Sequence, residues 1–271
     1  MTDSRLQPQI DAAEAYEALM GPALFGEWAE KVADAARIAP NERVLDVACG
    51  TGILTRAAAA RAGTAGLVAG LDPGPGMLEV ARRLAPAVTW REGVAESLPF
   101  SDDAFDAVVS QFGLMFFSDR PAALREMLRV LTPGGRLAIA VWDALDRIPA
   151  YAAEVALLER LAGRQAADAL RAPFALGDRD ALARLVEQSG VTDVRVSTDR
   201  GTARFPSVRV MVEADLRGWL PVVGIVLPED LIARILDEAG DVLVPYTRAD
   251  GSVAFDTSAH IVTGIAPPAR A

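Results

Sequence analysis

Short apolar stretches alternate with longer amphipathic ones along the chain, and this alternation predicts the secondary structure. Apolar residues recur at helical spacing through the first forty residues, where Gly21-Pro22 interrupts the run and Pro40 ends it. The apolar run at 43–48 is short and leads directly into a glycine turn, which is typical of a buried strand. An alanine-rich helix is expected at 53–62.

The same alternation continues to residue 142. Strands that alternate with helices at this spacing lie parallel and are joined by right-handed crossovers, so the pattern predicts a doubly wound α/β sheet. Further strands are expected at 66–72, 88–92, 105–111 and 136–142, helices at 76–85 and 121–131, and a turn at 132–135.

After residue 142 longer helices dominate. Helical segments fall between the fifth and sixth strands, and again between the sixth and seventh. Ligands of open α/β sheets bind at the carboxyl ends of the strands, so insertions on that side would cover a site. Helices are expected at 149–170, 178–189, 207–220 and 228–239, and strands at 191–198 and 253–265.

The composition excludes several classes of protein. Among 271 residues there is one cysteine, Cys49, which excludes an intrachain disulfide and any multi-cysteine metal site. One histidine, His260, excludes sites that need several imidazoles, so no metal is expected. Lys31 is the single lysine, which leaves Schiff-base and P-loop chemistry poorly supported.

The charge balance bears on partners and location. With 27 Lys+Arg against 37 Asp+Glu the formal net charge is −10, which argues against a nucleic-acid partner. No apolar run reaches the eighteen residues of a membrane span, and the first residues lack the layout of a signal peptide. We therefore expect a soluble, cytoplasmic protein.

The glycine turn is the most informative segment. Gly50 and Gly52 have no Cβ, so the backbone between strand and helix can approach a ligand closely. The next strand ends at Asp72, twenty residues after Gly52, where a carboxylate can accept both hydroxyls of a ribose. The third glycine of the dinucleotide fingerprint is missing, which favours a nucleoside cofactor without a pyrophosphate.

Four segments carry a family resemblance: VLDVACGTG, LDPGPGMLEVAR, GVAESLPFSDDAFDAVVSQFGLMFF and LTPGGRLAIAVW. In this order and spacing they resemble the class I S-adenosylmethionine-dependent methyltransferases, and most of all the branch with the ubiquinone/menaquinone biosynthesis enzymes (methyltransferase type 11). The resemblance implies a Rossmann-like seven-stranded sheet, mostly parallel with an antiparallel last strand, and helical lid insertions. The cofactor would be S-adenosyl-L-methionine, released as S-adenosyl-L-homocysteine.

The resemblance also implies the residues that bind this cofactor. The turn would hold its methionine part and ribose, with Asp46 fixing the amino group. Asp72 would take the ribose hydroxyls. At the position before Ala95 the family commonly has an acid, whereas this chain has Val94. The implied cofactor-binding set is Asp46, Ala48, Gly50, Thr51, Gly52, Asp72, Pro73, Met77, Ala95, Glu96 and Gln111.

The chain is interpreted as one methyltransferase domain over 1–271. It has an N-terminal helical cap at 1–40, a cofactor-binding core at 41–142, and substrate-lid insertions at 143–190 and 207–250. His260 is the candidate general base; the alternative is that its side chain, in the last strand, faces a helix or solvent. Candidate substrate-pocket residues fall into three groups. Met115 and Phe116 could equally be core, and the N-terminal aromatics could equally belong to an amphipathic cap without contact to the ligand. The full set is Tyr16, Phe25, Trp28, Met115, Phe116, Trp219 and Tyr246.

These features predict an enzyme that transfers a methyl group to O, C or N of a small organic molecule, such as an aromatic, a quinone-like compound or a secondary metabolite. A sulfonium donor is already activated, so alignment and exclusion of water are the main tasks of the protein. Two alternatives stay open: a methyltransferase-like cyclase or binding subunit that transfers no methyl, and a nicotinamide oxidoreductase. A homodimer is compatible with the sequence.

Overall fold

The computed structural model describes residues 6–268, which contain one seven-stranded sheet in the order β3-β2-β1-β4-β5-β7-β6. The first five strands in the chain are mutually parallel where they pair, and β7 runs antiparallel to both of its neighbours. This is the predicted doubly wound sheet with an antiparallel last strand. The strands are β1 (Arg43–Val47), β2 (Leu67–Asp72), β3 (Thr89–Glu92), β4 (Phe105–Gln111), β5 (Leu131–Trp142), β6 (Thr192–Phe205) and β7 (Val253–Ile265).

The strand order reverses between β1 and β4. From β1 the chain proceeds outward to β2 and β3, then returns to the other side of β1 for β4 and β5. Loops that leave the carboxyl ends of β1 and β4 therefore diverge and leave a crevice between them. Any ligand of this sheet is expected at that crevice.

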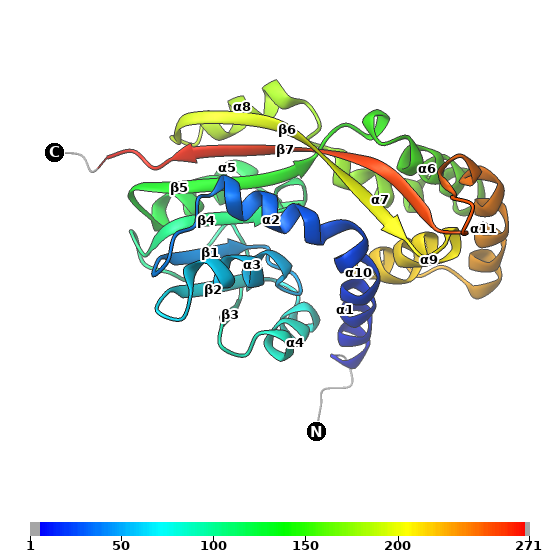
Figure 1. Cartoon of the computed structure of the whole chain (residues 1–271), viewed down its shortest axis with the longest axis horizontal. Helices are drawn as coiled ribbons and strands as arrows, with labels where there is room; N and C mark the ends of the chain where they lie inside the picture. The colour runs from blue at the N-terminus through cyan, green and yellow to red at the C-terminus, as the bar shows by residue number, and fades with distance from the viewer. Residues whose placement is uncertain (1–5, 269–271) are drawn as a thin grey trace.

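Helices cover both faces of the sheet (Figure 1). One group packs beside β1 and β2, and a second group packs behind β5 and β6. Beyond the carboxyl ends of the parallel strands a third group forms a separate helical layer, drawn at the right of Figure 1. The longer helices are α1 (Gln7–Met20), α2 (Gly26–Ala35), α3 (Ile53–Ala62), α4 (Pro75–Leu84), α5 (Arg120–Val130), α6 (Pro149–Ala162), α7 (Arg164–Arg171), α8 (Arg179–Glu187), α9 (Val208–Glu213) and α11 (Glu229–Val242).

Three details differ from the sequence-based expectations. The helix expected at 149–170 is two helices, because Gly163 adopts φ 85° and ψ 175° and separates α6 from α7. β6 continues to Phe205 instead of ending at residue 198, since it pairs with β7 over nearly its whole length. The turn expected at 132–135 lies within β5 as an irregularity, where the pairing with β4 passes from Leu131 to Arg136.

Two short π-helical segments interrupt the helical layer. The first, η1 (Gly21–Phe25), joins α1 to α2, and the second, η5 (Ala214–Trp219), lies between α9 and the short α10 (Leu220–Val222). α1 packs against both α4 and η5. The N-terminal helix thus bridges the sheet and the helical layer.

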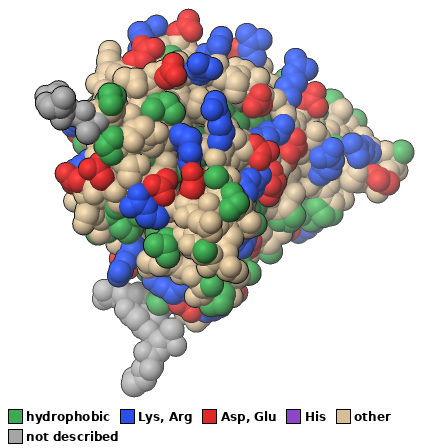
Figure 2. Space-filling model, turned by 60° about the vertical axis from the view of Figure 1, so that its left-hand side comes forward, with side chains coloured by type: hydrophobic (Ala, Val, Ile, Leu, Met, Phe, Trp, Pro, Cys, Tyr) green, Lys and Arg blue, Asp and Glu red, His purple; other side chains and the backbone are tan. Residues whose placement is uncertain are grey.

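The surface is polar and of mixed charge. Figure 2 shows acidic and basic side chains interspersed over one face of the molecule. Many of them form ion pairs; Arg61, for example, contacts Glu30 and Asp34. Within residues 6–268 no helix combines the length and the apolar character that a membrane crossing requires.

Candidate functional site

A cavity of about 500 Å³ lies at the carboxyl ends of β1, β2 and β4, at the predicted crevice. We call it the turn cavity, because the segment after β1 forms one side of it. Ten of the eleven residues expected to bind the cofactor line it. They are Asp46, Ala48, Gly50, Thr51, Asp72, Pro73, Met77, Ala95, Glu96 and Gln111.

The turn after β1 is built from left-handed backbone. Ala48, Gly50 and Gly52 have φ of 59°, 54° and 87°. A Cβ added to Gly50 would meet no protein atom within 4 Å, so this glycine keeps its side open toward the cavity. A Cβ on Gly52 would lie 2.4 Å from the Trp90 ring. Gly52, expected among the cofactor residues, does not line the cavity, and its missing side chain makes room for Trp90.

Asp72 at the end of β2 closes the turn from the opposite side. Its Oδ2 accepts a hydrogen bond from the Gly50 N–H at 2.8 Å, and its Oδ1 accepts one from the Gly74 N–H at 2.8 Å. Burial raises the pKa of this carboxyl, and the two backbone donors oppose that rise. The acid therefore both fixes the turn and presents its remaining lone pairs to the cavity.

Two acceptor atoms in the cavity wall lack partners among the described residues. Asp46 is 1% exposed; its Oδ2 accepts from the Thr55 hydroxyl at 2.6 Å, whereas Oδ1 accepts nothing. Burial raises the pKa of Asp46 to about 7, against the lowering effect of Thr55. Gln111 donates from Nε2 to the Phe25 carbonyl at 3.2 Å, and its Oε1 is unpartnered. Buried acceptors without donors mark a place where a ligand donor would be stabilised.

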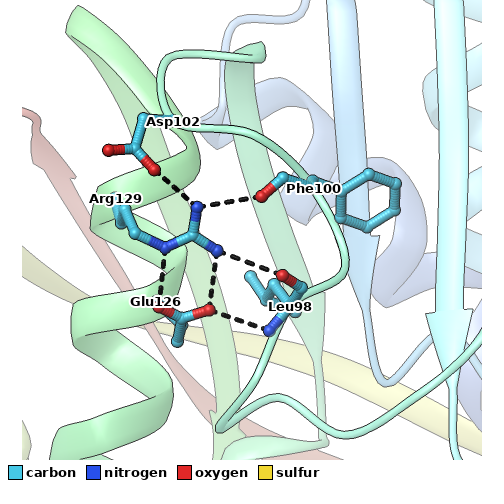
Figure 3. A network of polar contacts seen from close by, with 5 residues as sticks. All are labelled: Leu98, Phe100, Asp102, Glu126 and Arg129. Carbon is cyan, nitrogen blue, oxygen red and sulfur yellow. Dashed lines mark hydrogen bonds and ion pairs between the residues drawn. The ribbon is translucent and has the colours of Figure 1, made fainter.

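The loop between β3 and β4 brings Ala95 and Glu96 to the cavity. Figure 3 shows how Arg129 of α5 holds this loop: its guanidinium donates to the carbonyls of Leu98 and Phe100 at 3.1 and 2.9 Å. Glu126 completes the network by accepting from the Leu98 N–H at 2.8 Å. Glu96 itself accepts from the Ser118 N–H at 2.8 Å. The backbone of the loop that carries Ala95 and Glu96 is thus held by side chains of α5.

Helix α1 is joined to the turn after β1 by contacts that the sequence motifs did not reveal. Glu17 accepts a hydrogen bond from the Thr51 hydroxyl and pairs with Arg56 at 2.6 Å. Arg56 also donates to the Thr51 carbonyl at 2.8 Å. Because Thr51 belongs to the turn, these contacts fasten α1 to the cavity mouth. No sequence signal identifies Glu17, since it is one acid of an acidic amphipathic helix.

Four of the seven candidate substrate-pocket residues line the turn cavity: Tyr16, Phe25, Phe116 and Trp219. The other three do not. Trp28 is 1% exposed and packs edge-on against Trp142 at 5.8 Å between ring centroids. Met115 is buried in the main core, and Tyr246 packs edge-on against Phe255 in a different hollow.

His260, the candidate base, lies in that other hollow and not in the turn cavity. Its Nε2 lies 3.0 Å from the Gly177 carbonyl and 3.3 Å from Asp143, and its Nδ1 lies 2.8 Å from the Thr198 hydroxyl. These partners occupy both ring nitrogens. The side chain, which is 3% exposed, is therefore a hydrogen-bonded core group of β7. Among the described residues no group of histidine, cysteine and acidic side chains could hold a metal ion.

Comparison with known proteins confirms the resemblance derived from the motifs. Residues 45–139 match the family described as methyltransferase domain. The chain is 42% identical over 134 residues to demethylmenaquinone methyltransferase of Renibacterium salmoninarum, covering 48% of this chain and 55% of that protein. It is 38% identical over 133 residues to 2-phytyl-1,4-naphtoquinone methyltransferase of Thermosynechococcus vestitus, covering 47% and 59%. The chain thus spans little more than half the length of these curated relatives.

Solved structures support the fold over a larger part of the chain. The YcgJ protein of Bacillus subtilis superimposes with a TM-score of 0.57 at 22% identity, covering 89% of this chain and 99% of that one. Phosphoethanolamine N-methyltransferase 2 of Haemonchus contortus, solved with S-adenosyl-L-methionine, gives a TM-score of 0.59 at 17% identity, covering 94% and 56%. The Rossmann-like sheet and its surrounding helices are therefore shared with these structures.

Proposed function

We propose that this chain, whose residues 45–139 belong to the methyltransferase domain family, is an S-adenosylmethionine-dependent methyltransferase acting on a small organic molecule. One observation carries the proposal. The turn cavity combines the Asp72 carboxylate, the open side of Gly50, and the unpartnered acceptors Asp46 Oδ1 and Gln111 Oε1. These acceptors suit the ammonium of an amino acid and the hydroxyls of a nucleoside joined to it.

The residues present fit such a cofactor at both ends. The ammonium of the methionine part would donate hydrogen bonds to Asp46 Oδ1 and Gln111 Oε1. Both atoms, which lack a partner in the structure, would then have one. Asp72 would accept from the ribose hydroxyls, and Gly50 would allow close approach. When bound, the sulfonium would supply a methyl group, whose carbon a nucleophile attacks in line with the departing sulfur.

The adenine would lie on the loop side of the cavity. Pro73 and Met77 would pack on the ring, and Ala95 and Glu96 would lie at its edge, all of them in the cavity wall. Val94 stands where an acid is common in the family, and it is 48% exposed with no hydrogen-bonding side chain. We therefore expect the adenine amino group to be recognised without a carboxylate at that position.

The helical layer would select the acceptor. We propose that 143–190 and 207–250 act as substrate-lid insertions and 1–40 as a cap, since Tyr16 of α1 and Trp219 of η5 both line the cavity. Their aromatic rings favour an aromatic or quinone-like acceptor, in agreement with the relatives named for quinone substrates. The helices would exclude water and hold the acceptor in line with the methyl group.

A direct experiment is a calorimetric titration with S-adenosyl-L-homocysteine, followed by assay of methyl transfer from S-adenosyl-L-methionine to a panel of reduced naphthoquinones, phenols and amines. Binding with formation of a methylated product supports the proposal. Cofactor binding without methylated product over the whole panel favours a cyclase or binding subunit. Binding of NAD in place of both sulfur compounds would overturn the assignment.

Two broader expectations accompany this proposal: a cytoplasmic location and assembly as a homodimer. The net charge of −10 favours solubility and disfavours nucleic acid as a substrate. Sedimentation equilibrium of the purified chain tests the assembly, and a monomer at micromolar concentration would refute it.

A further inference from the structure

A second, smaller cavity adjoins the turn cavity. It measures about 60 Å³ and shares Tyr16, Phe25, Phe112, Phe116 and Trp219 with the larger one as common walls. We call it the aromatic cavity, since eight of its thirteen lining residues are aromatic. The other lining residues are Met20, Leu24, Trp142, Tyr151, Leu170, Pro173, Phe174 and Asp215.

Asp215 is the single charged residue in this lining. It is 2% exposed, and its Oδ2 has no hydrogen-bond partner among the described residues. Behind it lies Glu154 of α6, which is 0% exposed and whose two carboxyl oxygens have no partner other than the Asp215 carboxyl. Burial raises the pKa of both carboxyl groups, and Glu154 is raised further by the charge of Asp215.

The surroundings offer this pair no positive charge. Among the described residues, no arginine, lysine or histidine lines the aromatic cavity. Tyr151 of α6 faces the pair, and Tyr16 of α1 lies beside Tyr151. A buried acidic pair without a cation, or a donor from outside the pair, is unfavourable for folding. Its placement against an otherwise apolar wall indicates that a ligand supplies the missing hydrogen-bond donor.

The backbone around the pair is also unusual. Both π-helical segments contribute to the wall of the aromatic cavity, η1 through Leu24 and Phe25, and η5 through Asp215 and Trp219. π-Helical turns are rare and occur frequently at functional sites. Here they turn an acid and three apolar side chains toward the same small space.

We propose that Asp215, with Glu154 behind it, accepts the hydroxyl proton of an aromatic acceptor whose ring lies between the aromatic walls that the two cavities share. This inference rests on the proposed methyl transfer. The acceptor O–H bond breaks and its proton passes to an Asp215 carboxylate oxygen. The electron pair left on the acceptor attacks the methyl carbon from its oxygen or through a ring carbon. In the second case the proton on that ring carbon then passes to the oxygen, which restores the aromatic ring. The C–S bond breaks, its electrons stay on sulfur, and the sulfonium becomes a neutral thioether.

A hydroxyl suits this site better than an ammonium for two reasons. The methyl donor already brings a positive charge into the adjoining cavity, and a second cation beside it would be repelled. Burial raises the pKa of both carboxyl groups, which brings them closer to that of a weakly acidic hydroxyl. Proton transfer is efficient when the pKa of the base lies near the ambient pH.

The test uses two probes of equal shape, 4-chlorophenol and 4-chlorotoluene, which differ in one hydroxyl. Their binding to the full chain is followed by quenching of tryptophan fluorescence, because Trp142 and Trp219 line the cavity. We expect wild type to prefer the phenol about tenfold, the scale of one hydrogen bond to a charged group. The preference should increase between about pH 6 and pH 9 as the pair ionises.

Three variants separate a proton acceptor from a packing role. Asp215→Leu should abolish the preference, and Asp215→Asn should keep part of it but remove its pH dependence. Glu154→Gln keeps a side-chain donor beside Asp215, so this variant should keep the preference. Thermal unfolding confirms that each variant is folded, and Asp215→Leu is expected to fold because apolar replacement of buried acids is often tolerated.

Three results would overturn the inference: equal binding of the two probes to wild type, a preference unchanged in Asp215→Leu, or tighter binding of benzylammonium than of 4-chlorophenol. S-Adenosyl-L-homocysteine is titrated into the same samples. Normal cofactor binding with no phenol preference refutes the role of Asp215 alone, whereas absent cofactor binding refutes the proposed function.

Discussion

Replacement of Asp72 by asparagine tests the cofactor site at its most constrained point. The two carboxylate oxygens accept from Gly50 and Gly74, each at 2.8 Å. Asparagine keeps one acceptor oxygen, so its NH₂ group must face one of these N–H donors or rotate toward the ribose. In either orientation the cofactor loses a charged acceptor that the turn helps to hold in place.

The expected loss follows from the strength of such a bond. Hydrogen bonds to charged groups contribute about 1.5–3 kcal/mol, which corresponds to about a ten- to 150-fold weaker affinity. Calorimetric titration of the variant with S-adenosyl-L-homocysteine measures this directly. Asp106→Asn is the matched control, because Asp106 pairs with Arg43 at 2.6 Å outside the turn cavity.

The reasoning fails if both the Asp72 and the Asp106 variant bind S-adenosyl-L-homocysteine within about twofold of wild type. A twofold change in affinity lies below the lower limit for one hydrogen bond to a charged group. A loss of affinity in both variants would show a general effect of charge. Far-UV circular dichroism of both proteins establishes that the sheet is intact.

Three further predictions concern the turn and its neighbour. Gly50→Val should abolish cofactor binding in titrations while the chain stays folded, because its side chain would enter the cavity; normal binding would remove Gly50 from the site. Gly52→Ala should lower the free energy of unfolding by about 1–3 kcal/mol in urea, because the new Cβ meets Trp90 at 2.4 Å; an unchanged midpoint would contradict this contact. Asp46 has a pKa raised from 3.8 to about 7, so its stabilising contribution is present below the unfolded value and is lost as pH rises through this interval. The free energy of unfolding in urea should therefore change less between pH 3.8 and about pH 7 in Asp46→Asn than in wild type. An equal change in both proteins would disprove the raised pKa of Asp46.

The sheet and most of its helices were predictable because their signals are local. The apolar run ending at Val47 and the acid at Asp72 lie within short segments whose spacing defines strand, turn and strand. The motifs around the carboxyl ends of the strands likewise predicted ten residues that the structure places in the wall of the turn cavity. Gly52 was misplaced, since only the structure shows that the Trp90 ring fills the space beside it.

The lining of the aromatic cavity was much harder to predict, because it is assembled from segments that lie far apart in the sequence. Asp215 reaches the aromatic cavity through a π-helical segment that no periodicity indicates, and Glu154 comes from a different helix. Trp28 and Tyr16 have the same chemical character in the sequence, yet one packs in the core and the other lines both cavities. Which aromatic faces a ligand depends on the packing of α1 against η5.

The attachment of α1 at Glu17 couples two equilibria. The contacts of Glu17 with Thr51 and Arg56 join the N-terminal helix to the turn, so release of α1 and loosening of the turn favour one another. A ligand that binds only the closed turn must then stabilise α1 by mass action, although Glu17 itself does not line the cavity. Amide hydrogen exchange in residues 7–20 would slow in proportion to occupancy, which makes this helix a built-in reporter of the bound fraction.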